Sequence, residues 1–382
     1  MSEQILTNCS LFDGETVREG RAVVIDDGRI ADIVAANKVG TDSNVLDLGG
    51  HLLAPGLIDL QVNGGGGVLF NDAPTVGTLR TIVAAHRRFG TTACLPTLIS
   101  DDPETMRLGI QAVAEAIAGG VAAVVGIHLE GPHLNPLYRG VHDADKMRPL
   151  DDAGIAMLCS PGSGRTLVTL APETVPAATI RRLCDAGVIV FGGHSAASYE
   201  ETLDALAAGM TGFTHLFNAM SPLTSRAPGM VGAALDDKRS FFGIIADGHH
   251  VHPASLRIAI RSKAMAKVCL VTDAMPTVGS DNKHFSLNGV AVTAISGRCV
   301  TAGGTLAGSD IGMIEAVRNI ARFGGVDVYE ALRMASAYPA AALGIDDSHG
   351  YVRQGYRADL IELDKEFNVL RSWVQGGMEN YT

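Results

Sequence analysis

Between residues 56 and 275 the chain alternates short apolar runs with longer stretches in which apolar residues recur every three or four positions. The short runs have the length of buried strands, and the longer stretches have the period of amphipathic helices. This alternation is typical of parallel βα units. We count eight apolar runs, at residues 56–62, 91–99, 122–130, 166–172, 188–195, 211–217, 240–250 and 267–275. Eight units predict an α/β fold with a closed (β/α)8 barrel of the TIM type.

The two ends of the sequence have a different pattern. Residues 1–52 contain short β-like runs, two of which are separated by the hairpin-like turn Asp26-Asp27-Gly28. Residues 346–382 return to this pattern. We therefore predict a small discontinuous β-sandwich domain, built from 1–52 and 346–382, beside a barrel domain that spans 53–345. Within the barrel, residues 274–308 form an excursion that precedes a long helix at 309–325.

Composition and charge limit the partners and the cellular compartment that we expect for this chain. The chain has 382 residues and a net charge of −11, from 30 basic and 41 acidic side chains, and its basic residues are scattered. This balance argues against nucleic acid as a partner. The six cysteines are widely spaced without a C-x-x-C pair, which predicts reduced thiols. The sequence shows neither a signal peptide nor about 18 consecutive apolar residues, so we expect a cytoplasmic protein without a membrane partner.

Polar residues close most of the apolar runs. The active site of such a barrel lies at the C-terminal ends of its strands, so these residues converge on one mouth. A divalent metal site requires this kind of convergence, with two or three imidazole or carboxylate ligands and one open position. The residues are Gln61, Asn63, His128, Glu130, His194, His215, Asp247, His249, His250 and Asp273.

Each residue has a structural alternative. Glu130 could cap the turn that follows it, but burying a carboxylate without a cation is costly, which favours a metal ligand. His128 faces the same side of its strand as Glu130 and is either a neighbour of the metal ligands or a satisfied core histidine. His194 and His215 could each be structural. Asp273 either caps the next segment or acts as the general base.

Several motifs are more specific than these single positions. In their order and spacing they resemble the N-acetylglucosamine-6-phosphate deacetylase family of the amidohydrolase superfamily, and the likeness covers nearly the whole chain. Alone, "PGLID" and "TDA" mark only the superfamily, whereas "HLEGP" combined with "THLFNAM" is more discriminating. The motifs are "LAPGLID", "HLEGPHLN", "GHSAA", "THLFNAM", "ADGHHV", "LVTDAM" and "GTLAGSD".

The resemblance implies a role for each matching residue. Glu130, His194 and His215 would bind the metal, Asp273 would be the catalytic base and acid, and His142 would stabilise the charge on the carbonyl oxygen. In the family the Arg226 loop reaches a neighbouring subunit, which implies a homodimer. The implied substrate contacts are Val141, His142, Asn218, Ala219, Arg226, Asp247, Gly248, His249, His250, Leu306, Ala307 and Gly308.

One departure from the wider superfamily changes the expected metal content. Many members carry a metal-binding H-x-H at the end of the first strand, where this chain has Gln61-Val62-Asn63. Amides are poor ligands compared with imidazole, so Gln61 and Asn63 form a vestigial metal site or surround the remaining ion without binding it. We expect one divalent ion per chain, with Zn²⁺ preferred and Fe²⁺, Co²⁺ or Mn²⁺ as alternatives.

The phosphate is expected at Arg226 and His250. Arg226 could be a solvated surface residue, but an acidic chain that binds a phosphosugar must supply local positive charge. A planar guanidinium also suits bidentate phosphate contacts.

The implied reaction is hydrolysis of N-acetyl-D-glucosamine 6-phosphate to D-glucosamine 6-phosphate and acetate, in amino-sugar catabolism. Alternatives are an N-acetylgalactosamine-6-phosphate deacetylase, whose substrate differs in one hydroxyl configuration, and a cyclic-amide hydrolase. A third alternative is a non-catalytic barrel that serves as an interaction protein. Such a barrel should lack some of the strand-end residues, whereas this chain has Glu130, His194, His215 and Asp273.

Overall fold

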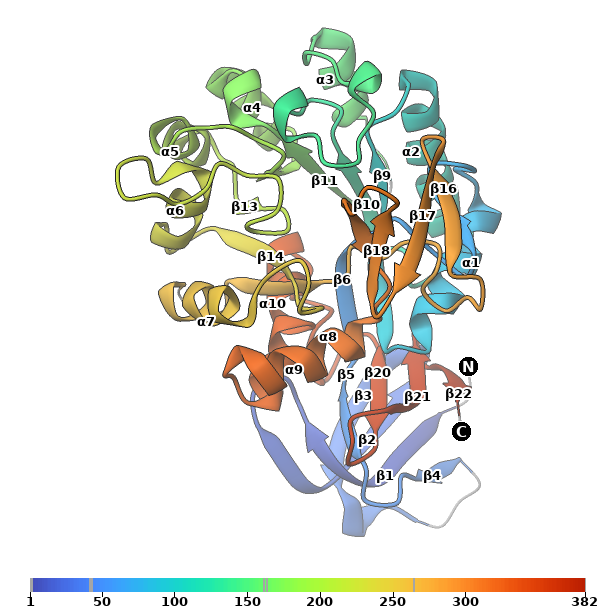
Figure 1. Cartoon of the computed structure of the whole chain (residues 1–382). Helices are drawn as coiled ribbons and strands as arrows, with labels where there is room; N and C mark the ends of the chain where they lie inside the picture. The colour runs from blue at the N-terminus through green and yellow to red at the C-terminus, as the bar shows by residue number, and fades with distance from the viewer. Residues whose placement is uncertain (1–2, 41–43, 161, 163, 264, 382) are drawn as a thin grey trace.

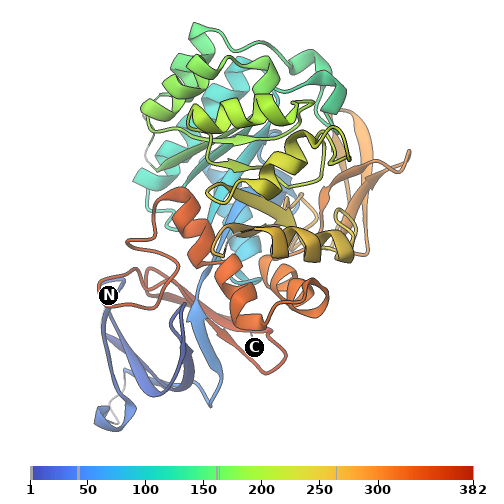
Figure 2. The same ribbon diagram turned by 90° about the vertical axis from the view of Figure 1, so that its left-hand side faces the viewer.

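The computed structural model describes residues 3–40, 44–160, 162, 164–263 and 265–381. Its central element is an eight-stranded parallel sheet in the order β15-β14-β13-β12-β11-β10-β9-β6. Figures 1 and 2 show this sheet surrounded by helices. Each strand coincides with one of the eight predicted apolar runs, which confirms the predicted barrel. The strands are β6 (Leu57–Val62), β9 (Thr91–Ile99), β10 (Gly126–Glu130), β11 (Arg165–Leu170), β12 (Ile189–Gly192), β13 (Gly212–Phe213), β14 (Phe241–Ile245) and β15 (Val268–Val271).

The first and last barrel strands meet just below the mouth. Beyond β15, the Asp273 N–H donates to the Gln61 carbonyl at 3.1 Å, and the Asn63 N–H donates to the Ala274 carbonyl at 2.9 Å. One step deeper, the buried Asp59 carboxylate accepts the Thr272 hydroxyl at 2.5 Å. Burial raises the pKa of Asp59 to about 7. This closure places Asp273 beside Gln61 and Asn63.

Amphipathic helices cover the outside of the barrel, as the sequence predicts. Stretches of helical period between the apolar runs form α1 (Val76–Arg87), α2 (Pro103–Ala118), α4 (Ala177–Asp185), α5 (Tyr199–Ala207) and α7 (Pro253–Ser262). The chain adds α3 (Asp152–Leu158), α6 (Gly229–Asp236), α9 (Val328–Met334) and α10 (Ala337–Leu343). Throughout the described ranges, no helix combines the length and the apolar character that crossing a membrane requires.

The long helix predicted at 309–325 is shorter than expected. Helix α8 (Met313–Asn319) is followed by a π-helical turn at Ile320–Gly324. Ser309 belongs instead to a strand, because its N–H donates to the Asp273 carbonyl at 2.9 Å. The Glu315 carboxylate accepts the Gly312 N–H at 2.7 Å, which caps the helix at that point.

The excursion before this helix is a four-stranded antiparallel sheet that lies near the barrel mouth (Figure 1). Its strands are β16 (His284–Leu287), β17 (Val290–Ile295), β18 (Arg298–Thr301) and β19 (Leu306–Ser309). The side chain of Asn288, in the turn between β16 and β17, donates to the Val141 carbonyl at 3.2 Å. The sheet is thereby tied to the loop that follows β10.

Both ends of the chain contribute to one further sheet, in the order β22-β21-β20-β5-β1-β2-β3, with β4 paired to β1. The expected hairpin is present, since Asp26 pairs with Arg29. Trp373 is fully buried in the core of this sheet, and its indole N–H donates to Gln4 at 2.9 Å. The strands are β1 (Gln4–Phe12), β2 (Val17–Asp26), β3 (Arg29–Ala35), β4 (Val45–Asp47), β5 (Leu52–Pro55), β20 (Leu360–Leu363), β21 (Val369–Val374) and β22 (Gly377–Asn380).

Candidate metal centre and active site

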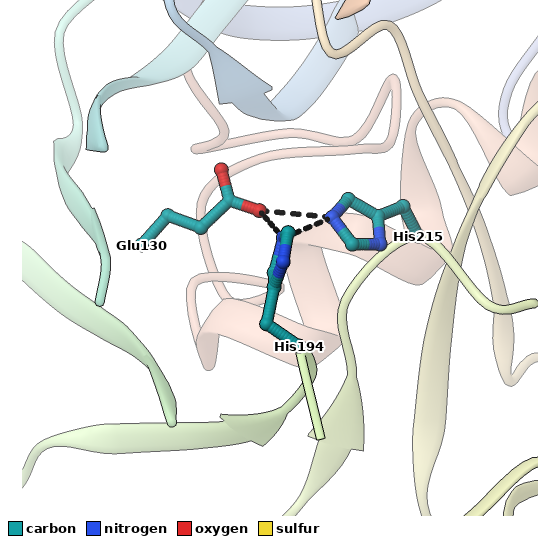
Figure 3. A group of neighbouring side chains, drawn as sticks. All are labelled: Glu130, His194 and His215. Atoms are coloured by element: carbon teal, nitrogen blue, oxygen red, sulfur yellow. Dashed lines mark hydrogen bonds and ion pairs between the residues drawn. The ribbon is translucent and has the colours of Figure 1, made fainter. Parts of the chain in front are cut away.

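Three predicted ligands meet at the mouth of the barrel (Figure 3). Glu130 ends β10, His194 follows β12 and His215 follows β13. Their ligand atoms lie within 4.8 Å of one another, and all three residues are buried. Glu130 Oε1 lies 3.2 Å from His194 Nε2 and 2.9 Å from His215 Nε2, and these nitrogens are 3.1 Å apart. His194 and His215 have left-handed φ values of 50° and 28°, so each strand end turns sharply at its ligand.

The hydrogen bonding around His194 fits a metal ligand. Its Nδ1 lies 2.9 Å from the Tyr138 carbonyl, which only accepts, so Nδ1 carries the proton and the neutral ring has a bare Nε2. That lone pair faces Glu130 and His215, and no Lys or Arg in the described parts of the chain forms an ion pair with Glu130. A divalent cation among one carboxylate and two imidazole ligands resolves this accumulation of electron-rich atoms.

Asp273 is linked to Glu130 through the side-chain amide of Gln61. Its Oδ1 accepts from Asn63 Nδ2 at 2.7 Å and from Gln61 Nε2 at 3.1 Å. Gln61 Nε2 also donates to Glu130 Oε2 at 3.0 Å. Burial, together with the negative charge of Glu130, raises the pKa of Asp273 to about 6. A carboxylate of this kind suits proton transfer near neutral pH.

The position of the superfamily's H-x-H motif is therefore occupied by amide donors. The N–H groups of Gln61 and Asn63 point at carboxylates that a second cation would otherwise neutralise. This arrangement favours a single ion.

His142 is held as a neutral N–H donor. Its Nδ1 accepts the Ser100 N–H at 3.2 Å, so the proton of the neutral ring is on Nε2. Burial lowers the pKa of His142 to about 3, and its ring centroid lies 4.5 Å from that of His194. Such a donor beside the metal ligands suits stabilisation of a developing oxyanion.

His128 is a satisfied buried histidine beneath this centre. Its Nε2 lies 2.8 Å from the Thr169 hydroxyl, and its Nδ1 lies 3.3 Å from the Thr97 hydroxyl. Burial lowers the pKa of His128 to about 4. With both nitrogens engaged, the ring supports the floor of the site.

Two groups of expected substrate contacts lie beside these residues. Val141 and His142 line a cavity of about 370 Å³ between the loop after β10 and the β16–β19 sheet. Leu306, Ala307 and Gly308 belong to β19, which runs along Asp273. Gly308 has a φ of 75°, and an added Cβ would lie 2.7 Å from the Asp273 carbonyl oxygen, so only glycine fits there.

Hydrogen bonds to the Asp247 carboxylate hold the segment that follows β14. Asp247 Oδ1 accepts the backbone N–H groups of His249 and His250 at 2.8 and 2.9 Å. Asp247 Oδ2 accepts from His250 Nδ1 at 2.6 Å, which leaves His250 Nε2 for other contacts. His249 Nε2 donates to the Ser296 carbonyl at 2.9 Å, and Gly248, with a φ of 79°, makes the turn. Asp247 thus shapes the loop that presents the two histidines.

The segment after β13 contains the remaining expected contacts. Asn218 Nδ2 donates to the His215 carbonyl at 3.1 Å, and the Ala219 carbonyl accepts the Ser195 N–H at 3.1 Å. The Asn218 bond lies within the loop that carries His215, and the Ser195–Ala219 bond ties this loop to the one that carries His194. Arg226 is exposed and forms no ion pair within the described part of the chain.

Sequence reasoning missed the groups that orient His194. They are the Tyr138 carbonyl, Asn135 and Glu173, which lie in loops after β10 and β11. Glu173 stands in "LAPET", directly after an apolar run, so the rule that strand-end polar residues face the mouth could have drawn attention to it.

Comparison with known proteins identifies the family. Residues 52–378 match the amidohydrolase family, and residues 5–53 match the NagA composite domain. N-acetylgalactosamine-6-phosphate deacetylase of Shewanella sp. is 44% identical over 85% of this chain and 82% of its own length. N-acetylglucosamine-6-phosphate deacetylase of Haemophilus influenzae is 35% identical, over 97% of this chain and 98% of its own length.

A solved structure agrees with these sequences. The crystal structure of N-acetylglucosamine-6-phosphate deacetylase from Pasteurella multocida superposes with a TM-score of 0.96 at 36% identity, covering 100% of both chains. The chain therefore belongs to the amidohydrolase family of metal-dependent enzymes, and within it to the group of N-acetylhexosamine-6-phosphate deacetylases.

Proposed function

We propose that this chain hydrolyses the acetamide of N-acetyl-D-glucosamine 6-phosphate to D-glucosamine 6-phosphate and acetate, in cytoplasmic amino-sugar catabolism. The observation that carries the proposal is the junction of the Glu130, His194 and His215 cluster with Asp273 through the Gln61 amide. This junction sets a general base beside a metal centre, as amide hydrolysis requires. The names of the Haemophilus and Pasteurella relatives support the substrate.

Glu130, His194 and His215 would hold one divalent ion. One carboxylate and two imidazoles suit Zn²⁺, and Fe²⁺, Co²⁺ and Mn²⁺ accept the same ligands. When bound, the ion supplies Lewis acidity that polarises an amide carbonyl and lowers the pKa of water.

The chain's own residues would move the protons. The amides of Asn63 and Gln61 hold Asp273 by Oδ1, which leaves Oδ2 to accept a proton from the attacking water. Asp273 then delivers this proton to the departing amine nitrogen. His142 would donate from Nε2 to the carbonyl oxygen as negative charge develops there.

The competing substrate is N-acetylgalactosamine 6-phosphate, which the 44% identity to the Shewanella relative favours. Acetate release should be measured on both 6-phosphates, on the two unphosphorylated sugars and on a cyclic amide. We expect the highest kcat/KM on N-acetylglucosamine 6-phosphate. Faster turnover of the galactosamine compound would replace the proposed substrate with its epimer. Activity confined to unphosphorylated sugars or cyclic amides would refute both.

Arg226 is proposed to contact the substrate phosphate across a homodimer interface, with His250 as the second donor. Arg226→Ala should raise KM for the 6-phosphate substrate at least about tenfold, or ~1.4 kcal/mol, because one charge-assisted contact is lost. Unphosphorylated N-acetylglucosamine should show no change. Arg181→Ala, at an exposed arginine on α4, serves as the matched control.

Mixing variants tests the contribution in trans. A protomer carrying Arg226→Ala keeps Asp273, and one carrying Asp273→Asn keeps Arg226. A mixed dimer would then contain one intact site, so combining the two variants should restore low-KM activity. Equal KM changes on both substrates, or mixtures no better than the separate variants, would remove Arg226 from the neighbouring site.

A further inference from the structure

The side chain of His194 is oriented by a neighbouring loop that contributes no metal ligand. The carbonyl of Tyr138 fixes the His194 Nδ1 proton, as described above. Tyr138 is in turn anchored to Asn135, because the Tyr138 N–H donates to the Asn135 carbonyl at 2.9 Å. The Asn135 N–H donates to the carbonyl of His194 itself at 2.9 Å. Hydrogen bonds therefore close a ring through His194, Tyr138 and Asn135, and this ring holds both the imidazole Nδ1 and the backbone carbonyl of His194.

The side chain of Asn135 connects this ring to Glu173, in the turn after β11. Asn135 Nδ2 donates to Glu173 Oε1 at 2.9 Å, and Asn135 Oδ1 accepts the Leu137 N–H at 2.9 Å. Glu173 also binds the residues that follow the ligand. Its Oε1 accepts the Ala196 N–H at 2.6 Å, and its Oε2 accepts the Ser195 hydroxyl at 2.6 Å. One carboxylate thus joins the loop that orients the imidazole to the loop that carries it.

The other histidine ligand lacks comparable support. Nδ1 of His215 is buried and has no hydrogen-bond partner in the described structure. Nδ1 of His215 is therefore not held by a protein acceptor, whereas Nδ1 of His194 is. Charge-assisted bonds to a carboxylate are stronger than neutral ones, so Glu173 dominates the network around His194.

We propose that Glu173 and Asn135 form a positioning pair that sets the ring orientation and tautomer of His194 and thereby the affinity of the site for its metal ion. The pair lies outside the proposed metal ligands and the proposed substrate contacts, and it acts through His194. The inference rests on the metal site within the proposed function, but not on the identity of the sugar. Outer partners of metal-binding histidines typically change metal affinity by about 10–100-fold when they are removed.

Three variants separate positioning from simple destabilisation. Glu173→Ala leaves the Asn135, Ser195 and Ala196 donors without their acceptor. Asn135→Asp keeps the shape of the side chain and its bond to Leu137 but faces the Glu173 carboxylate with a second negative oxygen. Glu173→Gln keeps an acceptor for Asn135 and Ala196, and its amide can donate to the Ser195 hydroxyl. It is therefore the conservative rescue.

The readout is the dissociation constant for Zn²⁺, measured by chelator competition on the full chain without any sugar. We expect Glu173→Ala and Asn135→Asp to raise this constant by about 10–100-fold, and Glu173→Gln to change it less than about threefold. Glu201→Ala is the control, since it removes a carboxylate that caps α5 and has no link to His194. Its Zn²⁺ affinity should equal that of the parent.

Thermal unfolding of the metal-free proteins shows which variants fold. If Glu173→Ala does not fold, Asn135→Asp alone tests the inference. Parent-like Zn²⁺ affinity in a folded Asn135→Asp would overturn the inference. A parent chain that binds Zn²⁺ but releases no acetate from any sugar would refute the proposed function and leave the positioning pair standing. A parent chain that binds no divalent ion would refute both.

Discussion

Asp273→Asn is expected to lower kcat by roughly 10²–10⁴-fold while the protein keeps its metal. Asparagine preserves the size of the side chain, and its carbonyl oxygen can still accept from Asn63 and Gln61 as Oδ1 of Asp273 does. The amide nitrogen that replaces Oδ2 cannot take a proton. Glu130, His194 and His215 are unchanged, so the metal site remains.

The measurement is kcat for acetate release, together with metal content per chain. Asp310→Asn provides the control, because Asp310 pairs with Lys283 in the neighbouring loop at 3.0 Å and has no proposed part in the reaction. It should retain parent-like kcat. Near-parent turnover in Asp273→Asn would instead make Asp273 a structural cap and end its assignment as the base.

Removing the metal should abolish deacetylation, and one equivalent of divalent ion per chain should restore it. Three ligands converge on one point, and the N–H groups of Gln61 and Asn63 already satisfy the carboxylates beside it. A second ion would have to displace those bonds and accept amide oxygens, which are weak ligands. Titration of chelator-treated protein with Zn²⁺, followed by activity and elemental analysis, gives the stoichiometry.

Glu130→Gln serves as the control for this titration. It keeps the shape of the ligand but loses its charge, so stoichiometric Zn²⁺ should fail to restore activity. If activity in the parent chain rose until two tight ions were bound, the single-ion interpretation would be wrong.

The barrel was predictable because its strands are buried on both faces. Such strands read as continuous apolar runs, and a polar residue that ends one of them stands out, as Glu130 and Asp273 do. The sheet of residues 284–309 gave a weaker signal, because β17 is largely exposed and does not read as a continuous apolar run. The turns at Asn288-Gly289 and Ser296-Gly297 are hairpin signals that could have revealed it.

The support of His194 was not predictable in the same way. It depends on the Tyr138 carbonyl, and a backbone carbonyl has no signature in the sequence. Glu173 was visible as a polar residue after a strand, but its three partners come from two loops whose paths only the fold determines. Arg226 poses a different difficulty, since its proposed partner lies on another subunit.

The pairing of β5 with strands from both ends of the chain has a consequence for folding during translation. β5 is hydrogen-bonded on one side to β1 and on the other to β20, and the first barrel strand begins directly after it. On the ribosome, β1 and β5 emerge before the barrel strands, whereas β20 emerges only after the whole barrel has been translated. Throughout this time one edge of β5 is an open template for pairing with other chains. That edge of β5 acquires its native partner only when β20 has been made.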